Sequence, residues 1–354
     1  MANHQIEANA GQPGGPDVLS RREIVTRTNM VLAEYGKLSL ERIRPMVRAG
    51  EAKRVVAFVR NRPGEAQHLI DSVGESLLAD EIRKVGLPAR VIGENNDNFP
   101  LGTGIEPRVV FAIDPFDNTS PYVRGHDTPA YSVVGAYDNR GVPIGGVIVD
   151  IMGNRIYASA NGKNTVTDVE TGLTKDLSRS QRTDIADENI SIASFVGEKQ
   201  YSLPFFDKLR PMLEGMHDKG MLYPGGGAFI YALLASGVID AYVIVGNEGD
   251  NEGEPRSEID PGLPLFIAAG GKIDSIDTET GKATRYKFDP DKTESDSIPF
   301  LIAYSQVEIR DSIIKAYLKG KAEVEERKKA IAFYREHQAM HEGKEYHLHS
   351  PQAN

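Results

Sequence analysis

The sequence predicts an α/β protein, because helical and strand-like patterns alternate over most of its 354 residues. Between Glu65 and Val85, apolar residues recur at the spacing of one helix face. Val109 to Ile113 is a continuous apolar run, as in a strand buried on both faces. After Asn189, strand and helix patterns alternate again, which predicts that the second half is an α/β unit.

The N-terminal region is predicted to be a tail followed by helices. Residues 1–18 are polar and rich in Gly and Pro, so we expect a disordered tail and no signal peptide. Ser20 and Glu23 have the spacing of a capping box, which predicts a helix to about Tyr35. Leu38 to Arg48 is predicted to form a second helical piece.

Strands are predicted to follow the third helix, which covers residues 65–85. A short strand at residues 89–92 leads into Gly93 and Glu94. Beyond residue 108, turn signals separate four strand patterns, which predicts an antiparallel meander. We expect these strands at residues 109–113, 131–137, 142–150 and 155–158, and a loop with a further edge strand within residues 161–188.

The second half is predicted to have its own strands and helices. We expect strands at residues 190–196 and 239–245, and helices at residues 203–214, 228–236 and 260–269. Residues 307–341 carry many charges and are predicted to form a pair of solvated or dimer-packing helices. The expected organisation is an N-terminal α+β subdomain (19–188), an α/β subdomain (189–305) and a C-terminal helical extension (306–354).

The composition argues against several classes of function. The net charge of −10 disfavours a binder of nucleic acid or of anionic membranes, because Lys and Arg surfaces hold phosphate groups. The absence of Cys excludes disulfides, thiolate metal sites and a Cys nucleophile. No apolar run approaches the roughly 20 residues that span a bilayer. We therefore expect a cytoplasmic protein without a nucleic-acid or membrane partner.

One segment carries most of the chemical information. An apolar strand ends in Asp114 and Asp117, two acids that are three residues apart. Pro115 fixes one backbone φ angle and has no N–H, so the chain can bring both carboxylates and the Phe116 carbonyl to one point. Oxygen ligands of this kind suit Mg²⁺. The segment therefore predicts a metal site in the N-terminal subdomain.

The residues around this segment have more than one explanation. The amides of Asn118 and Thr119 could face a phosphate, as amides do at turns and helix starts. A strand followed by an Asx turn would explain the same residues without any metal. Glu94 follows a glycine, as in many turns, and Asp260 precedes a proline, as a helix N-cap does.

The order and spacing of these segments resemble those of the inositol monophosphatase family, within the wider group that includes fructose-1,6-bisphosphatase. The family signature is Asp-Pro-hydrophobic-Asp-Gly-Thr, preceded by Gly-Glu-Glu and followed much later by Trp-Asp. The corresponding segments here are residues 93–95, 114–119 and 259–260. Asp71 with Glu75 resembles an acidic pair on the preceding helix, and residues 223–228 resemble a Gly-rich turn near the substrate.

The resemblance implies an alternating α-β-α-β-α sandwich and hydrolysis of phosphate monoesters with Mg²⁺. Glu94, Asp114 and the Phe116 carbonyl would bind one Mg²⁺. Asp114, Asp117 and Asp260 would bind a second, and Glu94 could hold a third through water. The resemblance also implies that the chain could form a homodimer.

The resemblance further implies which residues act on the substrate. Asp71 and Thr119 would pair, and Thr119 would help to orient the attacking water near Glu94. The substrate would lie against the residues of two backbone segments, Asn118 and Thr119 in the first and Gly226, Gly227 and Ala228 in the second.

Several positions depart from the family pattern. Asn118 replaces the usual Gly after the second acid, and Asn tolerates a left-handed backbone better than most residues. Asn95 and Ile259 replace a Glu and a Trp. Asp260 lies about two residues closer to the following Gly-Gly pair than the family spacing implies. Residues 246–257 are an acidic insertion, which we expect to be a flexible, solvated loop.

The sequence therefore favours a phosphomonoesterase that hydrolyses a small phosphorylated sugar or cyclitol, such as inositol monophosphate, by metal-activated water. Fructose-1,6-bisphosphate and a 3′-phosphoadenosine nucleotide are alternative substrates. A non-catalytic metal-binding or assembly module of the same fold is the alternative from another class. A dehydrogenase is disfavoured, because residues 225–227 lack the Gly-x-Gly-x-x-Gly arrangement between a strand and a helix.

Overall fold

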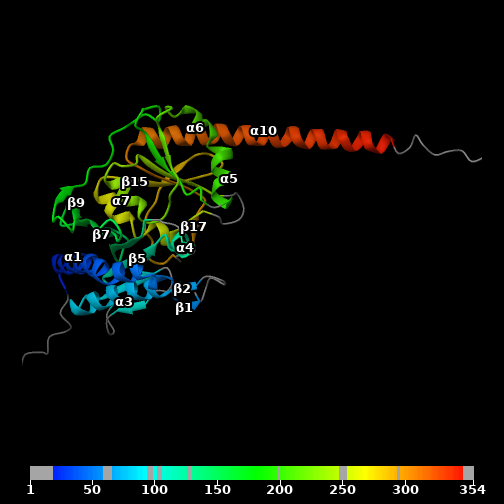
Figure 1. The fold of residues 1–354 in the computed structure, drawn as a ribbon. Coiled ribbons are helices and arrows are strands. Elements are labelled where there is room, and N and C mark those ends of the chain that lie inside the picture. Colours follow the sequence, from blue (N-terminus) through cyan, green and yellow to red (C-terminus); the bar gives the residue numbers. More distant parts are fainter. Residues whose placement is uncertain are drawn as a thin grey trace, which may run out of the picture.

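The computed structural model describes residues 19–58, 66–93, 99–101, 106–125, 129–197, 199–246, 253–292 and 296–345. These residues form five layers, in which helices and sheets alternate (Figure 1). The α-β-α-β-α sandwich expected from the sequence is therefore confirmed. The predicted tail, residues 1–18, lies outside the described residues.

The first layer consists of α1 (Arg21–Leu38) and α3 (Leu69–Lys84), which pack on one face of an eight-stranded sheet. The capping box that starts α1 is present, because Ser20 and Glu23 exchange side-chain and backbone hydrogen bonds. The chain continues from α1 through the π-helix η1 (Ser39–Ile43), α2 (Arg44–Ala49) and the 3-10 helix η2 (Glu51–Lys53).

The second layer is the eight-stranded sheet, with strand order β10-β9-β8-β7-β6-β5-β3-β4. β5 runs parallel to β3, and each strand from β5 to β10 pairs antiparallel with the next, which confirms the predicted meander. The strands are β3 (Ala89–Gly93), β4 (Phe99–Leu101), β5 (Val109–Asp117), β6 (Tyr131–Asp138), β7 (Pro143–Asp150), β8 (Arg155–Ala160), β9 (Lys163–Asp168) and β10 (Thr174–Asp176).

The fourth layer is a six-stranded sheet with strand order β12-β11-β13-β18-β15-β16. Its strands are β11 (Ser191–Ala193), β12 (Met221–Tyr223), β13 (Ala241–Val245), β15 (Lys272–Ile276), β16 (Ala283–Arg285) and β18 (Phe300–Tyr304). Two strand pairs lie outside the large sheets, namely β1 (Val55–Phe58) with β2 (Ala66–His68), and β14 (Glu254–Pro255) with β17 (Ser297–Ile298).

Helices fill the space between the two sheets and cover the outer face of the second sheet. The third layer contains α7 (Ile230–Ala235) and α9 (Leu263–Ala268), whose apolar side chains join both sheets in one core. The fifth layer contains α5 (Lys199–Lys208), α6 (Arg210–Gly215) and α10 (Val307–Glu345). Two short helices, α4 (Thr119–Val123) and α8 (Arg256–Ile259), lie at the ends of this framework.

The structure corrects the prediction of one helix that begins at Asp260. The chain instead forms α8, which ends at Ile259, and α9, which begins at Leu263. The N–H of Asp260 donates to the Arg256 carbonyl at 2.8 Å, so Asp260 completes the turn that Arg256 starts. Asp260 therefore follows a helix, whereas the sequence predicted that it precedes one.

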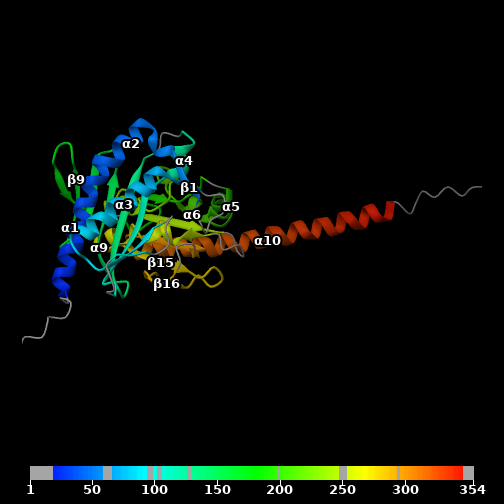
Figure 2. The same ribbon diagram turned by 90° about the horizontal axis from the view of Figure 1, so that it is seen from below.

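The structure also replaces the predicted C-terminal helix pair with one helix of 39 residues, α10. Ile313 and Tyr317 in its first half are buried against the second sheet. From Glu325 to Arg335 the side chains are exposed, and the helix extends well beyond the rest of the molecule (Figures 1 and 2). Within the described part of the chain, we find no helix with the length and apolar character that a membrane crossing requires.

Candidate active site

Two of the predicted metal ligands meet because β5 contains a bulge. Residues three apart on a regular strand point to opposite faces. The pairing of β5 with β6 shifts between Asp114, opposite Val133, and Asp117, opposite Tyr131. One extra residue on β5 therefore turns both carboxylates to the same face. Both side chains are buried there.

Glu258 is the third acid at this point. One carboxylate oxygen from each of Asp114, Asp117 and Glu258 lies within 4.8 Å of the other two. We call these three residues the acidic cluster. Carboxylate oxygens at such separations are the donor set that hard divalent cations use, so the residues present fit a metal ion of that class. Without a cation, the three negative charges would repel one another.

The structure does not bring Asp260 to the acidic cluster, contrary to the prediction. Its carboxylate pairs with Arg256, at 3.2 Å from Nε to Oδ2. The hydroxyl of Tyr286 donates to the other oxygen, Oδ1, at 2.7 Å. Burial raises the pKa of Asp260 to about 6, and the Arg256 charge and the Tyr286 hydrogen bond oppose this rise.

The helical turn explains why Glu258 and Asp260 have different partners. Successive residues of a helix are about 100° apart, so residues two positions apart point to nearly opposite sides. The sequence reasoning missed Glu258 because it matched Ile259 and Asp260 to the Trp-Asp pair of the family pattern. The sequence did contain a signal that could have identified Glu258. Asp260 lies about two residues too close to the Gly-Gly pair for the family spacing, and Glu258, two residues earlier, has the expected spacing.

The predicted Gly-rich turn lies directly against the acidic cluster. Gly227 has a φ of 104°, and a Cβ at this position would overlap the carboxylate of Asp117. The N–H of Phe229 donates to Asp117 Oδ2 at 2.7 Å. A Cβ on Gly226 would lie 2.5 Å from the Cβ of Phe195. Side chains larger than hydrogen are thus excluded where the turn approaches Asp117.

The residues after Asp117 adopt the backbone that the sequence suggested. Asn118 has a φ of 74°, the left-handed conformation that Gly, the residue at this position of the pattern it resembles, adopts readily. Its side chain donates to the Pro129 carbonyl at 3.0 Å. Thr119 begins α4, and its hydroxyl donates to the Phe116 carbonyl at 2.5 Å. The Thr119 oxygen is thereby left as an acceptor.

Two further acids belong to the predicted site. Asp71 is buried on α3, and its Oδ2 accepts the N–H of His68 at 2.9 Å. Glu94 lies outside the described residues, and its predicted role is still a prediction. The residue before it, Gly93, ends β3 and pairs with Ile113, the neighbour of Asp114.

A buried acid that the sequence reasoning assigned to a solvated loop lies near the acidic cluster. Glu254 is 3% exposed and accepts a hydrogen bond from the Tyr242 hydroxyl at 2.7 Å. Burial raises its pKa to about 8, and the negative charge of Glu258 adds to this effect. The loop expected to be solvated is therefore buried at residues 253, 254, 256 and 257, and residues 247–252 of it lie outside the described part.

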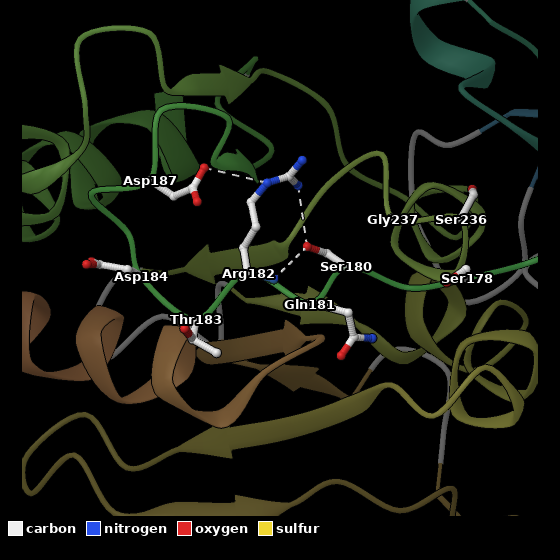
Figure 3. A pocket seen from close by; sticks show the side chains of 9 residues that line it. All are labelled: Ser178, Ser180, Gln181, Arg182, Thr183, Asp184, Asp187, Ser236 and Gly237. Carbon is white, nitrogen blue, oxygen red and sulfur yellow. Dashed lines mark hydrogen bonds and ion pairs between the residues drawn. The ribbon is translucent and has the colours of Figure 1, made fainter.

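The surface cavity drawn in Figure 3 is a different site. It has a volume of about 530 Å³ and lies near Asp240, which precedes β13. Arg182 in this cavity is paired with Asp187 at 3.7 Å and with Asp240 at 3.1 Å. None of the three residues of the acidic cluster lines it. Its lining residues are Ser178, Ser180, Gln181, Arg182, Thr183, Asp184, Asp187, Ser236 and Gly237.

Comparison with solved structures supports the fold. The extragenic suppressor protein suhB from Bartonella henselae superposes with a TM-score of 0.61 and 16% identity, over 83% of this chain and 99% of that chain. An inositol monophosphatase from Anabaena superposes with a TM-score of 0.57 and 17% identity, over 83% of this chain and 96% of that chain. At these identities the likeness concerns the fold alone.

Sequence comparison identifies the family. The Nus factor SuhB of Xylella fastidiosa is 29% identical over 97 residues, a match that spans 27% of this chain and one third of that protein (33%). The profile of the inositol monophosphatase family matches residues 25–293, which is most of the chain. The chain therefore belongs to the inositol monophosphatase family.

Proposed function

We propose that the chain is a Mg²⁺-dependent phosphomonoesterase that acts on a small phosphorylated sugar or cyclitol. The observation that carries this proposal is the convergence of Asp114, Asp117 and Glu258 beside the Gly-rich turn. Acids at such short separations, two of them buried, are unfavourable unless cations balance their charge. Family membership supports phosphate ester hydrolysis as the use of such a site.

The proposed metal ligands come from both halves of the chain. Asp114 and Asp117 at the end of β5 and Glu258 on α8 would hold divalent cations, and Glu94 and the Phe116 carbonyl would complete the set. Bound cations would neutralise the phosphate, lower the pKa of a water and stabilise the leaving oxygen. Because the donors are carboxylate and carbonyl oxygens, Mg²⁺ is the cation that we propose.

The remaining residues would orient the reactants. The hydroxyl hydrogen of Thr119 is used by the Phe116 carbonyl, so its oxygen would accept a hydrogen bond from the attacking water. We propose that Asp71 accepts the other hydrogen bond of this water, because the single hydroxyl hydrogen of Thr119 is already donated to the Phe116 carbonyl. The backbone of Asn118 and the turn at Gly226, Gly227 and Ala228 would line the site that holds the phosphate and the rest of the substrate.

A non-catalytic assembly module is the second candidate. The observation that favours it is the name of a relative, the Nus factor SuhB, although that match spans only a third of the relative. Such a module has no need of a cation, and its acids could serve packing alone. The two candidates therefore differ in whether Mg²⁺ binding and phosphate release depend on the acidic cluster.

An activity screen separates the two candidates. Phosphate release from inositol monophosphate, fructose-1,6-bisphosphate and a 3′-phosphoadenosine nucleotide would be measured with and without Mg²⁺, for the wild type and Glu258→Gln. Glu308→Gln, at an exposed acid of α10, is the matched control. We expect Mg²⁺-dependent release that Glu258→Gln abolishes and Glu308→Gln preserves. No release from any compound, together with no Mg²⁺ binding by calorimetry, would favour the module.

A further inference from the structure

The short helix α8 presents charged side chains to two different environments. Arg256 and Asp260 are one turn apart and form an ion pair, with Nε 3.2 Å from Oδ2. Glu258 lies between them in the sequence and belongs to the acidic cluster on the other side of the turn. Because the three residues share one helical turn, the contacts that fix Arg256 and Asp260 also fix the position of Glu258.

The ion pair is buried and has further partners in the segment after β16. The Tyr286 hydroxyl donates to Asp260 Oδ1 at 2.7 Å, and Arg256 Nη2 donates to the Asp289 carbonyl at 3.2 Å. The Arg256 guanidinium lies 5.4 Å from the ring centroid of Tyr286 and 5.9 Å from that of Phe288. Tyr286, Phe288 and Asp289 thus all contact the pair.

A helix of four residues cannot hold its own conformation. Helix nucleation is unfavourable, and isolated helices shorter than about 12 residues are marginal in water. A buried ion pair often adds little net stability, because the cost of desolvation offsets the attraction. The hydrogen bonds around Arg256 and Asp260 are therefore better explained as fixing the conformation of α8 than as stabilising the folded protein.

We propose that Arg256, Asp260 and Tyr286 form a positioning clamp that holds Glu258 at the acidic cluster. The proposal rests on the proposed function, because it assumes that Glu258 is a metal ligand. Asp260 then supports metal binding without being a ligand, because its contacts with Arg256 and Tyr286 hold α8 and therefore Glu258 in place. The segment at residues 286–289, remote from the cluster in sequence, becomes part of the support for metal binding.

A second tyrosine provides a matched control. Tyr304 donates to the buried Asp274 at 2.6 Å, and Arg310 pairs with the same carboxylate at 2.8 Å. This arrangement repeats the Tyr-Asp-Arg chemistry of the clamp, and its members join β15, β18 and α10. One tyrosine hydroxyl can therefore be removed from each network, from Tyr286 beside α8 and from Tyr304 between β15, β18 and α10.

The test measures Mg²⁺ binding by calorimetry for the wild type, Tyr286→Phe, Tyr304→Phe, Asp260→Asn and Glu258→Gln, together with kcat and the melting temperature. We expect Tyr286→Phe to weaken Mg²⁺ binding about tenfold, as removal of a partner behind a metal ligand does. Tyr304→Phe should lower the melting temperature but leave the Mg²⁺ Kd unchanged. Asp260→Asn should weaken binding less than Glu258→Gln, because an amide oxygen can still accept from Tyr286.

Each contrary result identifies what has failed. Equal Mg²⁺ affinity in Tyr286→Phe and Tyr304→Phe would overturn the clamp while leaving the proposed function intact. Loss of binding in Asp260→Asn as complete as in Glu258→Gln would overturn it too, since Asp260 would then be a ligand. Wild-type binding that Glu258→Gln does not change would overturn the assignment of Glu258, and the clamp with it. The absence of Mg²⁺ binding in the wild type would overturn both proposals.

Discussion

The N–H of Phe229 donates to Asp117 Oδ2 at 2.7 Å, which ties the turn before α7 to the end of β5. This contact joins the first sheet to the helix layer between the two sheets, beside the acidic cluster. It depends on Gly227, because a side chain there would overlap the Asp117 carboxylate. The orientation of a proposed metal ligand therefore depends on a glycine more than a hundred residues away in the sequence.

Gly227→Ala should weaken Mg²⁺ binding and lower kcat, each by about tenfold or more, since the methyl group displaces a proposed ligand. The same variant should also be less stable, because its φ of 104° is unfavourable for Ala. Gly172→Ala is the control for backbone strain, with a φ of 71° and open space around its Cβ. If both variants lose stability but keep the wild-type Mg²⁺ Kd, the contact with Asp117 is irrelevant to metal binding.

Asp114→Asn should lower the rate of phosphate release by about a hundredfold or more, because the resemblance to the family places Asp114 on both cations. Protein folding should survive, since the amide has the shape of the carboxylate. Asp176→Asn, at an exposed acid of β10, should behave as the wild type. Steady-state assays across a range of Mg²⁺ concentrations would check this, and a rate for Asp114→Asn near that of Asp176→Asn would contradict the assignment.

Sequence patterns predicted the fold well where the evidence was local. The apolar run at β5, the capping box of α1 and the alternating strands of the meander each depend on neighbouring residues. The motif from Asp114 to Thr119 was found for the same reason, because its acids are three residues apart and one bulge brings them together.

The rest of the site depended on contacts that sequence patterns do not reveal. Whether Glu258 or Asp260 faces the cluster is decided by a one-turn helix whose direction is set by Arg256 and Tyr286. The burial of Glu254 depends on Tyr242, which lies in β13. The acidic composition of residues 246–257 had instead predicted a solvated segment. Long-range partners therefore decided the positions of Glu254 and Asp260, which the sequence patterns did not predict.

The projecting half of α10 should contribute little to stability. Among the described residues, ion pairs that join α10 to the body near the start of this half include Arg210 with Glu323 and, at 3.7 Å, Arg327 with Asp207. Beyond these, Ile331 and Tyr334 are 52% and 73% exposed. A chain that ends at Lys329 should melt within about 2 °C of the full chain, because surface changes cost little. Calorimetry with light scattering would check this, and a large loss of stability together with a lower mass would show that α10 packs in an oligomer.

Glu254 should make the metal-free protein less stable as the pH rises. Its pKa in the folded protein is about 8, above the value of 4.5 expected for an unfolded chain. Below pH 4.5 both states hold the proton, so the acid has no effect. Between pH 4.5 and about 8 the unfolded chain loses the proton while the folded protein keeps it, and stability falls by up to a few kcal/mol.

Glu254→Gln should remove this part of the pH dependence. The amide can still accept the hydrogen bond from Tyr242 but carries no ionisable proton. The variant should therefore be more stable than the wild type at pH 8 and differ little from it near pH 4.5. Urea unfolding at several pH values without Mg²⁺ would measure the difference, with the exposed Glu170→Gln as the control. A constant difference between Glu254→Gln and the wild type over this range would mean that Glu254 is already ionised in the folded protein.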